Sequence, residues 1–144
     1  MYDRILVPTD GSETAAAAMR EAVALAARDD AEIHVLTVIN TRTYDTSIES
    51  AVEPLRERGE RYLADLTALA EADDVPVTTA IELGRPARTI LDYATDNDVD
   101  LVVMGTTGRG GLERRLLGST TEYVTAHAEV PVHVVPTAET ATSG

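Results

Sequence analysis

Three glycines and a run of hydroxyl residues between positions 105 and 122 suggest an anion-binding loop. Gly105 and Gly108 have no Cβ atom, so a ligand can approach the backbone closely at these positions, and Gly118 allows the turn into the next helix. Ser119-Thr120-Thr121 follow at the expected start of a helix, where unpaired N–H groups and hydroxyls are available. The partial positive charge of a helix N-terminus favours anions such as phosphate. The alternative is a surface loop whose serine caps the helix and which binds no ligand.

The same loop is locally basic in an acidic protein. It holds three of the 12 basic residues of a chain whose formal net charge is -13. Arg109 is the candidate for phosphate contact, whereas Arg114 and Arg115 more plausibly face solvent or pair with acidic neighbours. A P-loop is excluded because the chain contains no Lys, and "GTTGRGG" does not fit the dinucleotide-binding pattern. No G-x-S-x-G turn is present for a serine hydrolase.

Length and composition predict one domain in the cytoplasm. The chain has 144 residues, the size of a single domain, and no Cys, which excludes disulfides and thiolate chemistry. No apolar run is long enough to cross a membrane, and the first residues lack the features of a signal peptide. The three His residues are separated, so we expect no metal site in the protein.

The charge balance predicts a cytoplasm of high salt. The chain has 25 acidic residues and 12 basic ones, all of them Arg, and an acidic surface keeps a protein soluble when salt screens charge. Codon bias combined with ordinary acidity is the alternative explanation. A basic face is also missing, which argues against nucleic-acid binding.

Apolar runs and helical periodicity alternate along the chain. Ser12 is the expected cap of the first helix, Pro54 is expected in the first turn of the second and Pro86 near the start of the third. Strands are expected at 4–9, 32–39, 76–83, 99–105 and 131–136, and helices at 12–28, 48–74, 84–97 and 119–129. This alternation predicts an α/β fold in which a parallel sheet carries helices on both faces. Residues 1–136 then form the domain and 137–144 a flexible tail.

The fold class places any ligand beyond the carboxyl ends of the strands, near the point where the strand order reverses. Pro8, Thr9 and Asp10 follow the first strand, and Gly105 begins the glycine loop after the fourth. These two polar, tightly turning segments are therefore the expected walls of the site. For Asp10 the alternative role is to stabilise the turn into the first helix.

The glycine spacing resembles that of a known family. Gly105-x2-Gly108-x9-Gly118-Ser119 matches the G-2x-G-9x-G-S/T signature of nucleotide-binding universal stress proteins. Four further segments are similar to the typical sequence of the family: "ILVPTDGS", "VDLVVMGTTGRGG", "LLGSTTEYV" and "PVHVVP". The resemblance therefore extends from about Tyr2 to Pro136. It implies an adenine-nucleotide alpha-hydrolase-like fold, an open five-stranded sheet in the order 3-2-1-4-5.

The resemblance also implies a ligand and its contacts. ATP or another adenine nucleotide would lie where the strand order reverses, which is called the topological switch point. Mg²⁺ or Mn²⁺ would be held mainly through the phosphates. Asp10 would lie near the ribose or the metal–phosphate region, and Val38 would contact adenine. The other residues implied as nucleotide contacts are Pro8, Thr9, Met104, Gly105, Gly108, Arg109, Gly118, Ser119 and Thr120.

The last expected strand predicts a partner. Residues 132–135, "VHVV", are apolar and lie at the sheet edge in the implied order, and an exposed apolar edge invites pairing. A two-fold partner would satisfy that edge, and members of the family commonly form homodimers through this strand. The alternative is that the C-terminal tail covers the edge.

These observations favour a stress-response binding module or sensor over a fast enzyme. Asp10 is the single carboxylate on the site-forming segments with a plausible role, and no general base is placed for water attack. Two other classes remain open. One is a nucleotide-free dimeric interaction module, and the other is a slow ATP hydrolase.

Overall fold

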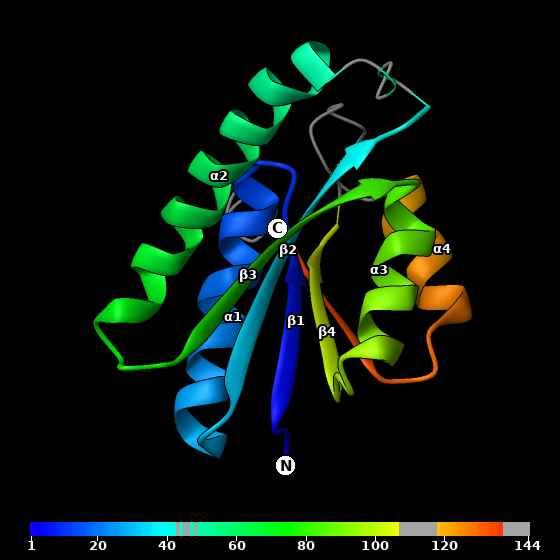
Figure 1. The fold of residues 1–144 in the computed structure, drawn as a ribbon. Coiled ribbons are helices and arrows are strands. Elements are labelled where there is room, and N and C mark those ends of the chain that lie inside the picture. Colours follow the sequence, from blue (N-terminus) through cyan, green and yellow to red (C-terminus); the bar gives the residue numbers. More distant parts are fainter. Residues whose placement is uncertain (43, 45–46, 48, 107–117, 137–144) are drawn as a thin grey trace.

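Strands and helices alternate strictly along the chain, as the sequence predicts (Figure 1). The structure is a computed structural model that describes residues 1–42, 44, 47, 49–106 and 118–136. The predicted tail at 137–144 lies outside the described residues. The elements are β1 (Arg4–Pro8), α1 (Glu13–Asp29), β2 (Glu32–Asn40), α2 (Glu49–Glu71), β3 (Val77–Gly84), α3 (Pro86–Asp96), β4 (Leu101–Gly105), α4 (Ser119–His127) and β5 (Val132–Val135).

The strands form one parallel sheet in the order β3-β2-β1-β4-β5, which confirms the predicted topology. Ile5 lies between Ile33 of β2 and Leu101 of β4, so β1 is the central strand. The chain leaves β1 towards β2 and later returns to its other side as β4. The strand order therefore reverses between β1 and β4, at the carboxyl ends of both strands.

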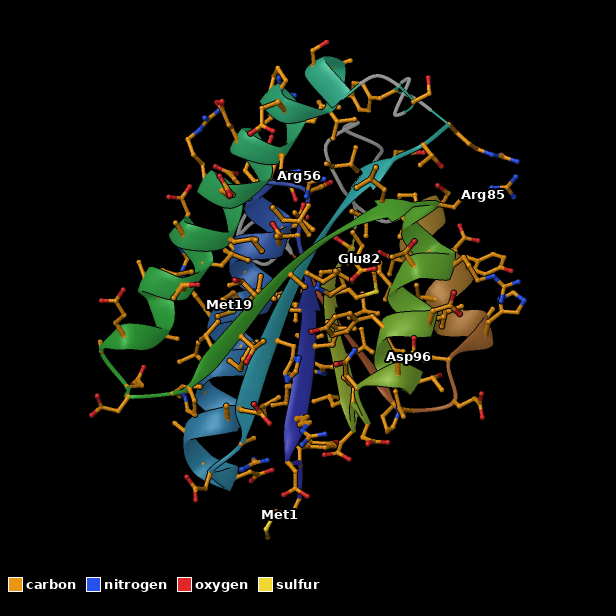
Figure 2. All side chains as sticks on the ribbon, viewed as in Figure 1. Met1, Met19, Arg56, Glu82, Arg85 and Asp96 are labelled. Carbon is orange, nitrogen blue, oxygen red and sulfur yellow. The ribbon has the colours of Figure 1, made fainter. Side chains whose placement is uncertain are left out.

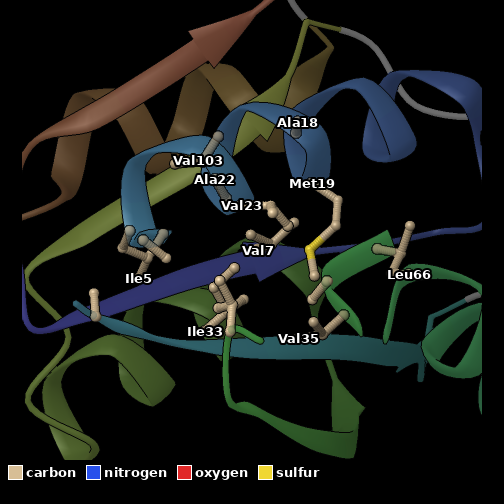
Figure 3. Packing of buried hydrophobic residues seen from close by; sticks show 14 of the residues in the cluster. Ile5, Val7, Ala18, Met19, Ala22, Val23, Ile33, Val35, Leu66 and Val103 are labelled. Carbon is tan, nitrogen blue, oxygen red and sulfur yellow. The ribbon is translucent and has the colours of Figure 1, made fainter. Parts of the chain in front are cut away.

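Both faces of the sheet are covered by helices, also as predicted. Helices α1 and α2 cover one face and α3 and α4 the other (Figure 1). Alternate residues of each strand point to opposite faces, so Ile5 and Val7 enter one core and Leu6 the other. Figure 3 shows the first of these cores, in which Met19 of α1 packs over Val7 and Val35.

The helix starts follow recognisable local signals with one exception. The Ser12 Oγ accepts a hydrogen bond from the N–H of Ala15 at 3.3 Å, and Pro86 is the first residue of α3. The prediction for Pro54 was wrong, because α2 begins at Glu49 and Pro54 lies inside it. A proline there lacks the N–H that would bond the carbonyl of residue 50, and the helix tolerates the loss near its start. In the described part of the chain, no helix has the length and apolar character needed to cross a membrane.

Candidate functional site

The segment after β1 forms a turn whose polar groups are largely used within the fold. Thr9 is 6 % exposed; its N–H donates to the Leu36 carbonyl at 2.8 Å, and its carbonyl accepts from the Thr37 Oγ1 at 2.9 Å. The Thr9 Oγ1 also accepts from the Gly11 N–H at 3.0 Å. These bonds join the end of β1 to β2. Thr9 therefore shapes this wall of the site, and its contact with a ligand stays a prediction.

Asp10 is exposed at the mouth of the same turn. Its Oδ1 accepts a hydrogen bond from the Ser12 N–H at 3.0 Å, and the Ser12 Oγ lies 2.8 Å from the Thr14 Oγ1. Asp10 thus has the turn-stabilising role that the sequence offered as the alternative. Pro8 ends β1 beside it and is half-buried. No metal-ligand group of three or more carboxylates or imidazoles occurs among the described residues.

Gly11 allows α2 to pack against the turn after β1. It has φ of +84°, a left-handed conformation that glycine adopts without steric cost. A Cβ atom at this position would collide with the ring of Tyr62 from α2. The turn after β1 therefore fits closely beneath α2.

Gly105 must be small because Thr14 of α1 packs against it, a contact that the sequence did not reveal. A Cβ atom on Gly105 would lie 2.5 Å from the Cβ of Thr14 and 2.8 Å from its backbone carbonyl carbon. The first turn of α1 thus packs directly on the end of β4. The Gly105 carbonyl in turn accepts a hydrogen bond from the Thr121 Oγ1 at 2.9 Å, so this residue joins β4 to α1 and α4. A close approach of ligand to this glycine stays a prediction.

Two of the residues implied as nucleoside contacts belong to the core beneath α3. Met104 is 5 % exposed, and Val38 is half-buried and packs against the same cluster. Val38 lies near the carboxyl end of β2, and Met104 precedes the last residue of β4. Both are therefore near the predicted edge of the sheet, although their burial is what any fold of this kind requires.

Helix α4 begins at Ser119, as predicted, and has no serine cap, which was the alternative. Gly118 is the N-cap and provides no side-chain hydrogen bond, so Ser119 is the first residue of the helix. The Gly118 N–H donates to the Thr106 carbonyl at 2.7 Å, which anchors the helix start to the end of β4. Ser119 is exposed and Thr120 half-buried. Because Gly118 has no side chain, the cap residue itself provides no side-chain acceptor for the first N–H groups of α4.

The structure brings together most of the predicted site and adds residues that position it. Gly108 and Arg109 lie outside the described residues. Thr14, Thr37 and Tyr62 were missed, because each acts through a tertiary contact that leaves no local sequence signal. Thr121 belongs to the Ser-Thr-Thr run, which was a usable signal. The resulting arrangement is a turn, a glycine strand end and a helix N-terminus that converge at the switch point, the geometry that binds anions in parallel α/β sheets.

Comparison with known proteins identifies the family and agrees with the fold. The model of the Universal stress protein family matches residues 1–136. The chain is 38 % identical over 140 residues to universal stress protein MJ0531 of Methanocaldococcus jannaschii, an alignment that covers 94 % of this chain and 82 % of that protein.

Solved structures share the fold. One is hypothetical protein MJ0577, whose biochemical function was assigned from its structure. It superposes with a TM-score of 0.84 and is 34 % identical in sequence, and the match covers 94 % of this chain and 96 % of the MJ0577 chain. Another is a universal stress protein in complex with cAMP. Its TM-score is 0.73 and its sequence identity 24 %, and the match covers 94 % of this chain and 97 % of that chain. This chain belongs to the universal stress protein family.

Proposed function

We propose that this protein binds ATP or another adenine nucleotide at the carboxyl edge of the sheet, between β1 and β4. The observation that carries the proposal is the start of α4, where Gly118 leaves the first N–H groups without a side-chain cap beside the end of β4. Phosphate oxygens are suitable acceptors for such groups. That a protein of the same fold was solved with cAMP supports an adenine nucleotide as the guest.

The proposed contacts divide by the part of the nucleotide. Val38 and Met104 would lie against the base, and Asp10 near the ribose or the metal–phosphate region. The remaining proposed contacts are Pro8, Thr9, Gly105, Gly108, Arg109, Gly118, Ser119 and Thr120. Mg²⁺ or Mn²⁺ would be held through the phosphates. We propose a binding module or sensor, because Asp10 is the single described carboxylate on the turn after β1 and it already accepts the Ser12 N–H.

Titration of the purified protein with ATP and magnesium in molar KCl tests the proposal. We expect micromolar binding that Gly118→Ala weakens at least tenfold, because a methyl group at the helix start crowds the phosphate. Thr125→Ala, in the last turn of the same helix, is the matched control and should bind like the wild type. Absence of binding by the wild type would contradict the proposal. Phosphate release that depends on a divalent metal and is lost in Asp10→Ala would instead indicate a slow hydrolase.

We further propose a homodimer that forms through β5. Within the described sheet this strand, Val132–Val135, is an edge strand whose one neighbour is β4. Val132 and Val134 are half-buried, so pairing with a second copy would cover apolar surface as well as the backbone groups of the outer edge. Sedimentation velocity at micromolar concentration should give the mass of a dimer, and a monomer under these conditions would refute this part.

The acidic composition supports a stress-response role in the cytoplasm of a halophile. A net charge of -13 on 144 residues repels itself at low salt and is screened at high salt. We expect the free energy of unfolding to rise steeply with KCl between about 0.1 M and 1 M. Equal stability across that range would remove the basis for halophily.

A further inference from the structure

The charge of the molecule is distributed unequally between the two ends of the sheet. The amino end is formed by the last turn of each helix and the connection that follows it, residues 26–31, 68–76, 93–100 and 124–131. These segments hold one basic residue, Arg28, so their net charge is -8 with His127 neutral. Their nine carboxylates are Asp29, Asp30, Glu71, Asp73, Asp74, Asp96, Asp98, Asp100 and Glu129.

The described part of the carboxyl end is close to neutral. It consists of the residues that follow each strand and the first turn of the next helix, 9–16, 41, 42, 44, 47, 49–52, 85–89, 106 and 118–122. The described residues there include three arginines, Arg42, Arg85 and Arg88, and the four carboxylates Asp10, Glu13, Glu49 and Glu122, a net charge of -1. Figure 2 shows this difference along α3, where Arg85 lies at the carboxyl end of the sheet and Asp96 at the amino end.

The described arginines at the two ends also differ in their partners. In the amino-end segments, the Arg28 Nε donates to the Asp29 Oδ1 at 3.0 Å. At the adjoining starts of β1 and β2, the Arg4 Nε donates to the Glu32 Oε1 at 2.9 Å. Arg42, Arg85 and Arg88 are exposed and form no ion pair with any described residue. An unpaired arginine projects its field into solvent, whereas a paired one is largely neutralised by its partner.

The fold holds two of these arginines close together. The Thr41 N–H donates to the Gly84 carbonyl at 3.1 Å, which ties the segment after β2 to the segment after β3. The residues that follow these bonded positions are Arg42 and Arg85. The helix dipoles act in the same direction, because all four helices begin at the carboxyl end and finish at the amino end.

We infer that this segregation guides an anionic ligand to the carboxyl end, and that Arg42, Arg85 and Arg88 are the guiding residues. The inference rests on the proposed function and adds to it a preference by charge. An anion that approaches the amino end meets a net charge of -8, and the repulsion grows with the charge of the anion. The three arginines therefore speed the association of ATP more than that of cyclic AMP, which carries less negative charge.

Stopped-flow association of fluorescent N-methylanthraniloyl-ATP with two triple variants tests the inference. The first variant is R42Q/R85Q/R88Q. The control, R20Q/R58Q/R61Q, removes the same charge from exposed arginines in the middle of α1 and α2. Glutamine and arginine have similar helix propensities, so the two variants differ in where the charge is lost. An uncharged osmolyte such as trimethylamine N-oxide maintains the fold at low ionic strength.

At about 0.1 M KCl we expect roughly five- to tenfold slower association for R42Q/R85Q/R88Q and less than a twofold change for the control. The difference should be smaller for the corresponding cyclic AMP derivative and should largely disappear at about 1 M KCl. Equal slowing in both variants would overturn the inference while leaving the proposed function intact. No association with the wild type would overturn both.

Discussion

Some residues at the switch point are required for close packing, a role that is distinct from ligand binding. Gly105 is needed because Thr14 packs on it, and Gly11 because the ring of Tyr62 covers it. Gly118, by contrast, has φ of -66° and ψ of 158°, an extended conformation that any residue adopts. Its backbone angles therefore do not demand glycine, which leaves room for a role in binding.

Gly105→Ala should lower the free energy of unfolding by about 1–3 kcal/mol, because the added methyl group meets both the side chain and the backbone of Thr14. Urea denaturation in constant molar salt measures the change. With nucleotide removed from all three proteins, Gly118→Ala is the control and should keep the wild-type midpoint, because its backbone angles suit any residue. If Gly105→Ala were as stable as the wild type, the close packing of α1 on β4 would be disproved.

At the level of secondary structure, the turns after three helices each contain an aspartate with a positive φ. Asp30, Asp74 and Asp98, which follow α1, α2 and α3, have positive φ values of 58°, 53° and 52°. Glycine is the residue that most often occupies this conformation at a helix end. Each aspartate also places negative charge near helix carbonyls that already carry partial negative charge, which is unfavourable at low salt.

Asp74→Gly should therefore raise the free energy of unfolding by up to about 1 kcal/mol, since glycine has no steric cost at positive φ. Asp73→Gly removes the same charge from the adjacent residue, whose φ is not positive, and should give no such gain. Thermal unfolding of both variants beside the wild type distinguishes the two contributions. An equal gain in both would assign the effect to charge alone.

Most of the fold could be predicted from the sequence, because it depends on local patterns. Apolar runs marked the strands, Ser12 and Pro86 marked the starts of α1 and α3, and the alternation of elements gave the parallel sheet. The start of α2 was predicted to within one residue, but Pro54 was wrongly assigned to its first turn, because a proline in the second turn gives a similar local pattern. The contacts that build the site could not be predicted, since Tyr62 on Gly11 and Thr14 on Gly105 join residues far apart in the sequence.

The whole molecule combines the fold of its family with an uneven distribution of charge. The sheet places β1 beside β4, and the same parallel topology brings every helix N-terminus to one end and every C-terminus to the other. The sequence adds carboxylates to the negative end and leaves exposed arginines at the opposite one. An acidic protein can thus offer an anion site without a basic surface overall.

We propose above all that the carboxyl end of the sheet holds an adenine nucleotide. The most direct test is to purify the protein in molar KCl, denature it and identify by mass spectrometry any small molecule that is released. We predict an adenine nucleotide in near-stoichiometric amount from the wild type and little or none from Gly118→Ala. Release of no nucleotide, together with no ATP binding at high salt, would contradict the account and favour a dimeric module that acts without nucleotide.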